Sequence, residues 1–176
     1  MAAKSQRVNA TQFLEVELAD LHEEYYGKIS RYAAVHIGNR TDAEDIAGEV
    51  FLRALKSLGS YKHRGIPMQA WLFKIAHNLV VDYLRKMSKR KTVDIDNITV
   101  RSNENLEAIT EVNIEVERVK KAMEQLTREQ REVLSLRFFG ELTSKEAAAI
   151  LGKSDGAVRE MQRAATSKLR ILLVTD

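Results

Sequence analysis

The residues with the clearest chemistry lie near the carboxyl end of the chain, around Arg159 and Arg163. An arginine can donate two hydrogen bonds to guanine, Gln162 can pair with adenine, and Glu160 can accept from cytosine. Lysines and arginines around them suit phosphate groups, which position a protein on nucleic acid without specifying sequence. The predicted contacts to duplex DNA are Ser154, Asp155, Arg159, Glu160, Gln162, Arg163, Lys168 and Arg170.

Two short helices must position these side chains. Residues 144–151 have small and apolar side chains on one face, and Gly152 follows where a left-handed backbone would end a helix. A second helix, capped by Ser154 or Asp155, then carries apolar residues three and four apart. This layout predicts a helix-turn-helix, whose second helix enters the major groove of DNA. A plain amphipathic helical hairpin is the alternative interpretation.

A second candidate site begins at the loop 61–69 and continues into a helix at 70–90. Its cations could neutralise the phosphates of a single strand, and aromatic side chains could stack on a base. Tyr61 is a candidate for stacking, whereas Trp71 opens an apolar stripe and is more typical of a core residue. The predicted set is Tyr61, Lys62, His63, Arg64, Lys74, Asn78, Arg85, Lys86 and Lys89.

Carboxylates recur on one face of a predicted helix at 42–58, at Asp42, Asp45 and Glu49. Negative charge near a helix N-terminus is favourable in itself, which would explain these residues structurally. A docking surface for a basic partner helix is the functional alternative.

Charge is distributed unevenly along the 176 residues, whose formal net charge is +3. Residues 51–91 hold 10 basic and 1 acidic residue, whereas residues 92–117 hold 1 basic and 7 acidic residues. Two basic blocks around an acidic stretch suggest two contacts with a polyanion. The absence of cysteine excludes disulfides and zinc–thiolate sites, and no apolar run is long enough for a membrane span. We expect a cytoplasmic protein without a secretory signal, membrane insertion or cofactor.

The apolar spacing predicts an all-α fold with two small domains, at residues 20–90 and 113–173, joined by an acidic linker at 91–112. Thr41 with Glu44, Thr127 with Gln130, and Thr143 with Glu146 have the spacing of capping boxes. The predicted helices cover residues 20–37, 42–58, 70–90, 113–125, 128–139, 144–151 and 155–173.

Taken together, three segments resemble the extracytoplasmic-function group of bacterial sigma-70-family sigma factors, which have only regions 2 and 4. They are DAEDIAGEVFLRAL, WLFKIAHNLVVDYLRK and LTREQREVLSLRFFGELTSKEAAAILGKSDGAVRE, within a resemblance that covers about residues 20–172. The chain differs from the family pattern at Gly48, where Gln is common, and at Ala164, where many relatives have a DNA-contacting Arg.

The resemblance implies a non-catalytic subunit that binds core RNA polymerase and directs it to promoters. Asp42, Asp45 and Glu49 would dock on the β′ clamp helices, and the β flap is a further expected contact on the polymerase. The loop 61–69 with Asn78 would capture an unstacked base of the −10 element, a step that costs a few kcal/mol. The helix from Asp155 would read the −35 element, and an anti-sigma factor is an expected further partner.

Two other functions fit parts of the sequence. A helix-turn-helix repressor or activator without polymerase docking would explain residues 142–170 equally well. A helical metal hydrolase would use His22, Glu23, Asp42, Asp45 and Glu49, but the helix at His22 lacks the second histidine of the zinc motif. We therefore expect no catalytic or metal-binding residues, and we interpret each histidine as an ordinary core or surface residue.

Overall fold

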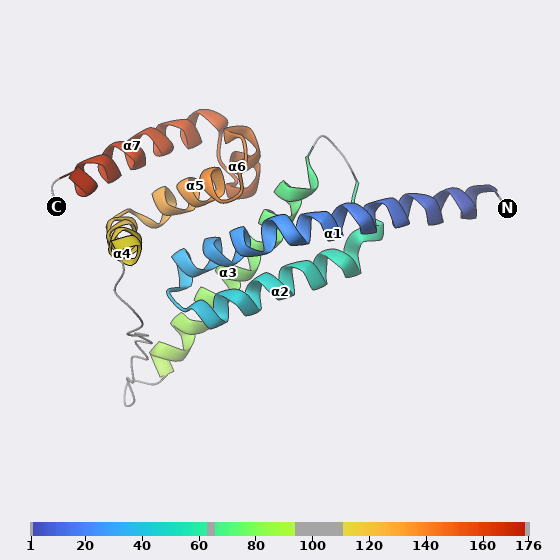
Figure 1. Ribbon diagram of the computed structural model, residues 1–176, viewed down its shortest axis with the longest axis horizontal. Helices are drawn as coiled ribbons and strands as arrows, with labels where there is room; N and C mark the ends of the chain where they lie inside the picture. The colour runs from blue at the N-terminus through green and yellow to red at the C-terminus, as the bar shows by residue number, and fades with distance from the viewer. Residues whose placement is uncertain (1, 63–65, 94–110, 175–176) are drawn as a thin grey trace.

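The structure is a computed structural model that describes residues 2–62, 66–93 and 111–174 (Figure 1). This part of the chain is helical and contains no strand, which confirms the all-α fold class. The elements are α1 (Ala2–Ile37), α2 (Arg40–Ser57), the 3₁₀ helix η1 (Leu58–Ser60), α3 (Met68–Val93), α4 (Glu111–Glu124), α5 (Arg128–Phe138), α6 (Ser144–Leu151) and α7 (Asp155–Val174).

The first three helices pack against one another because each has a stripe of apolar residues broken by alanines. In α2 this stripe includes Ile46, Val50 and Ala54, all buried as the spacing predicts. Tyr32 of α1 and Phe73 of α3 meet edge to face, with ring centroids 5.6 Å apart. Small residues between the large ones let the helix axes approach closely, so this part of the core is dense.

Local capping explains where several helices begin and end. Thr127 and Thr143 form the predicted capping boxes with Gln130 and Glu146. The prediction for Thr41 was wrong, because Asn39 caps α2 and its side chain accepts a hydrogen bond from the Asp42 backbone N–H at 3.0 Å. Asparagine is among the strongest N-cap residues and lies two positions earlier, so the helix starts sooner. Gly152 ends α6 with φ of 63°, as expected of a left-handed C-terminal residue.

The largest difference from the predicted boundaries is at α1, which begins at Ala2 instead of near residue 20. In its first half, Leu14 and Leu18 pack on the core, whereas Phe13 and Val16 remain 70% and 58% exposed. Of the predicted linker, residues 91–93 end α3 and residues 111 and 112 begin α4. The remainder, 94–110, lies outside the described residues.

The helices that precede and follow the predicted linker share one hydrophobic core. Helix α5 packs on α1, and α6 packs on α3, so that the two groups of helices lie side by side (Figure 1). One continuous buried cluster includes Tyr32 and Phe73 from the first group and Leu136 and Leu142 from the second. A Cβ added to Gly140 would lie 3.3 Å from the Phe73 ring, which shows how closely the two groups approach.

Candidate nucleic-acid interface

Helices α6 and α7 present the predicted arginines to solvent. Val158 and Ala165 lie on the buried side of α7, so the opposite side of this helix is free to face DNA. The side chains of Arg159 and Arg163 are 64% and 74% exposed. Arg159 pairs with Asp155 at 3.2 Å, and Arg163 pairs with Glu160 at 2.9 Å. Such exposed pairs contribute little to stability, so both arginines can exchange a carboxylate for a base edge at small cost.

Three other residues of the predicted set are used within the domain. The Ser154 hydroxyl accepts from the Ala157 backbone N–H at 3.2 Å, which makes Ser154 a cap of α7. Gln162 accepts from Arg137 Nε at 2.9 Å, and Lys168 Nζ donates to the Gln125 carbonyl at 2.5 Å. Their contacts to DNA stay predictions, and for Gln162 the amide oxygen is already occupied by α5.

A shallow groove runs along α7 and brings together most of the predicted readers. It is lined by Arg159, Gln162, Arg163, Thr166, Ser167 and Arg170. Arg137, which the sequence interpretation missed, supports this groove from below by bonding Gln162 and the Leu142 carbonyl oxygen. Its position at the end of an amphipathic helix gave no signal that distinguished it from a surface cation.

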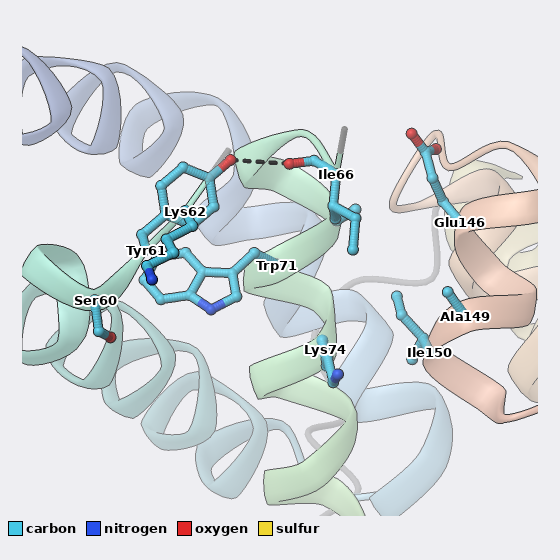
Figure 2. A pocket seen from close by; sticks show the side chains of 10 residues that line it. Ser60, Tyr61, Lys62, Ile66, Trp71, Lys74, Glu146, Ala149 and Ile150 are labelled. Carbon is cyan, nitrogen blue, oxygen red and sulfur yellow. Dashed lines mark hydrogen bonds between the residues drawn. The ribbon is translucent and has the colours of Figure 1, made fainter. Parts of the chain in front are cut away.

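The predicted strand-capture site contains a pocket with aromatic walls (Figure 2). Tyr61 and Trp71 stack at a tilt of 39°, with ring centroids 4.8 Å apart. Tyr61 Oη donates to the Ile66 carbonyl oxygen at 2.9 Å, which ties the two sides of the loop together. Burial, followed by the Glu17 carboxylate, raises the pKa of Tyr61, so the phenol stays protonated at neutral pH. The pocket also contains Lys62 and Lys74, while His63 and Arg64 lie outside the described residues.

Trp71 is a partly buried residue of the core, as its place at the start of an apolar stripe predicts. It packs against the hydrophobic core from one side and lines the pocket with the other. The aromatic surface at this site is therefore anchored rather than freely rotating, which lowers the entropy that a stacked base would have to offset.

The cationic face of α3 extends from this pocket along one side of the helix. Lys74, Asn78, Arg85 and Lys89 are all exposed, as their spacing predicts. Arg85 pairs with Asp82 at 3.0 Å, and Lys86 is exposed beside it. The face therefore offers positive charge to a polyanion over several turns.

The acidic face of α2 is only partly free. Asp42 accepts from Tyr83 Oη at 2.5 Å, and burial together with this bond raises the pKa of Tyr83 to about 12. Glu49 accepts from Arg53 at 2.6 Å, which lowers the pKa of its carboxyl, and Asp45 is exposed. Leu52 and Leu55 of the same helix are 52% and 54% exposed, and the sequence interpretation did not include them. The sequence did contain a signal for this exposure, because the helical positions of both leucines fall outside the buried apolar stripe of α2.

Within the described residues, no three histidine, cysteine or carboxylate side chains gather in a way that could hold a metal ion. No helix among the same residues has the length and apolar character that a membrane crossing needs.

The fold and these surfaces define a helical DNA-binding protein with a helix-turn-helix at its carboxyl end. The sequence family described as sigma-70 region 2 matches residues 21–90, and sigma-70 region 4 matches residues 122–170. The chain is 36% identical over 134 residues to the ECF RNA polymerase sigma factor ShbA of Streptomyces griseus, covering 73% of this chain and 70% of that protein. The chain therefore belongs to the ECF RNA polymerase sigma factors of the sigma-70 family, which are transcription-initiation proteins.

Two further comparisons describe how far this likeness extends. The chain is 32% identical over 163 residues to the ECF sigma factor BldN of Streptomyces coelicolor, covering 89% of this chain but 60% of that protein. In three dimensions it is similar to the sigma factor RpoE of Bartonella quintana, solved in complex with the anti-sigma factor NepR. That match has a TM-score of 0.73 at 23% identity and covers 91% of this chain and 98% of the other, which supports the fold.

Proposed function

We propose that this chain binds core RNA polymerase and directs it to promoters with two DNA-reading units, residues 20–90 and 113–173, connected by residues 91–112. The observation that carries the proposal is the presence of two cationic surfaces. One is the arginine groove of α7, and the other is the aromatic pocket that continues into the cationic face of α3. Because the chain belongs to the sigma family, these two surfaces support the proposal that it reads two promoter elements.

In this proposal, α7 reads the −35 element as duplex DNA. Arg159 and Arg163 exchange their carboxylate partners for base edges, and Arg170 neutralises phosphate. The −10 strand lies on the cationic face of α3 after melting, with one base stacked against Tyr61. Stacking of this kind contributes about 1–3 kcal/mol per base, which offsets the cost of removing the base from the duplex.

Docking on polymerase would use the face of α2 that carries Asp45, Glu49 and the exposed Leu52 and Leu55. Apolar side chains ringed by charge are the usual composition of a protein-binding surface. Asp42 would contribute less than its position predicts, because Tyr83 already holds its carboxylate. The clamp helices of the β′ subunit and the β flap are the proposed contacts, and the proposed location is the cytoplasm.

The structural relative from Bartonella was solved with an anti-sigma factor bound. We propose that this chain also has such a partner.

The chemistry of nucleotide addition would belong to the polymerase, so the chain itself would act as a binding subunit.

The test is run-off transcription from a library of genomic fragments with purified bacterial core polymerase, with and without the chain. The proposal predicts discrete transcripts that require both proteins and start downstream of a shared pair of sequence elements. A helix-turn-helix regulator would instead bind DNA alone and would not co-purify with core polymerase. Tight binding to specific fragments without new transcripts would support that alternative and contradict the proposal.

A further inference from the structure

The pocket of Tyr61 and Trp71 has a second wall that comes from the other end of the chain. Glu146, Ala149 and Ile150 of α6 face Lys62, Ile66 and Trp71 across the pocket (Figure 2). Glu146 is held in place because its carboxylate accepts from the Thr143 backbone N–H at 2.7 Å. A fixed negative charge at this position opposes the entry of a phosphate-bearing strand.

Contacts beyond the pocket hold α5 and α6 against the first three helices. Lys28 Nζ lies 2.7 Å from Glu141 Oε1 and 3.2 Å from Glu24 Oε1. The hydrogen bond to Glu141 raises the pKa of Lys28, so the lysine remains charged. Glu141 adopts a left-handed backbone, with φ of 54°, which is uncommon for a residue other than glycine. Together with the shared core around Phe73, these contacts define one closed arrangement.

Two half-buried histidines, on α1 and α3, lie close to charged residues of α5. Tyr32 Oη and His77 Nδ1 are 3.2 Å apart, and the His36 ring packs on Tyr32 with centroids 4.8 Å apart. His36 Nε2 is buried without a hydrogen-bond partner among the described residues. The charged groups that act on the pair come mostly from α5. They are Arg128 and Arg131, which oppose a positive charge, and Glu132, which favours one on His77.

We propose that this chain, when free, closes its own strand-binding pocket with α6, and that protonation of His36 and His77 between α1, α3 and α5 opens it. The part of the proposal that concerns the access of a DNA strand rests on the proposed function. The conformational part stands on the packing alone and is tested without DNA or polymerase.

The direction of the pH effect follows from the burial of the two rings. Burial, assisted by Arg131, lowers the pKa of His36 to about 3, and burial also lowers the pKa of His77. In an open arrangement without α5, a histidine titrates near its ordinary pKa of about 6.5. The closed state is therefore favoured above that pH and loses stability as pH falls below it. For one histidine, the ratio of closed to open molecules falls about tenfold between pH 7.5 and pH 5.5.

The experiment measures the radius of gyration by small-angle X-ray scattering and the accessibility of Trp71 by acrylamide quenching, both at pH 7.5 and 5.5. Trp71 is the only tryptophan of the chain, so its fluorescence reports on the pocket directly. Circular dichroism at 222 nm measures helix content in the same samples. The non-titrating variant is His36→Phe with His77→Asn, and the matched control is His22→Gln, because His22 is exposed.

Opening predicts that the radius of gyration and the quenching constant both rise at pH 5.5 while helix content stays constant. The rise should disappear in His36→Phe/His77→Asn and persist in His22→Gln. The proposal is overturned if the wild-type chain keeps its dimensions at pH 5.5, if the non-titrating variant expands equally, or if helix content falls together with the expansion.

Discussion

Lys28 of α1 and Glu141 of the α5–α6 turn are 113 positions apart in the sequence, yet their charged atoms lie 2.7 Å apart. The Lys28 ammonium also lies over the Tyr25 ring, 4.3 Å from its centroid. This contact joins the helix-turn-helix to the region 2 helices, and Gly140 and Leu142 on either side of Glu141 are buried. Closure therefore depends on residues that contact neither promoter element in the proposed function.

Reversal of this pair tests the closed arrangement without titrating any group. We expect Lys28→Glu to bring its new carboxylate against those of Glu24 and Glu141 and to expand the free chain at neutral pH. The double variant Lys28→Glu/Glu141→Lys should restore the wild-type radius of gyration. The coupling should be about 0.2–1 kcal/mol, because Glu141 is largely exposed to solvent. An expansion that the second substitution does not reverse would show that the ion pair is not the cause.

The capping residues provide a test of the local structure. Thr143→Ala removes the side chain that accepts from the Glu146 backbone N–H at 3.2 Å and should destabilise the chain by about 1 kcal/mol in urea unfolding. Thr41→Ala is the matched control, because Asn39 and not Thr41 caps α2, so its effect should stay within about 0.5 kcal/mol. Equal losses for the two variants would contradict the assignment of the caps.

Much of the fold could be predicted because its signals are local. The boxes at Thr127 and Thr143 and the left-handed Gly152 each follow from a few neighbouring residues, and the structure confirms them. The early start of α1 was not predicted, although Leu14 and Leu18 have helical spacing and pack on the core, because the exposed Phe13 and Val16 lie between and beside them.

The sequence predicted which side chains of the candidate site are exposed, but not which other side chains of the chain they contact. The exposed positions of Arg159 and Lys89 follow from helical spacing alone. The engagement of Gln162 by Arg137 and of Asp42 by Tyr83 depends on packing between helices, which periodicity does not encode. The meeting of α6 with the Trp71 pocket is a long-range contact of the same kind.

Arg159 should contribute to sequence preference in the −35 element. We expect Arg159→Ala to weaken binding of the polymerase holoenzyme to promoter duplex by about 1–3 kcal/mol and to relax preference at one position. The measurement is competition binding across promoter variants. Arg40→Ala removes a more exposed arginine from α2 and should leave the preference intact. An unchanged preference in the Arg159 variant would remove this residue from base readout.

Lys89 should act on the phosphate backbone and not on sequence. Lys89→Ala is expected to weaken holoenzyme binding to a similar extent on all promoters and to reduce the slope of log affinity against log salt by about 1. Titrations at several salt concentrations measure both quantities. A loss confined to particular promoter sequences would contradict this assignment.

Tyr61 should stabilise the melted strand specifically. In holoenzyme, Tyr61→Ala should weaken binding of a fork DNA with a single-stranded −10 element by about 1–3 kcal/mol, while duplex −35 binding is unaffected. Phe13→Ala removes an exposed aromatic ring from the outer part of α1 and serves as the control. If the two variants bind the fork DNA equally well, Tyr61 does not stack on the strand.

In the proposed function, one chain holds two separate stretches of promoter DNA while polymerase performs the chemistry. Permanganate reactivity of thymines on a promoter found by run-off transcription tests it most directly. Holoenzyme with the wild-type chain should make thymines of the −10 element reactive, and replacement of either promoter element should abolish the signal. Melting that persists after the −35 element is replaced, or that occurs with core polymerase alone, would contradict the account.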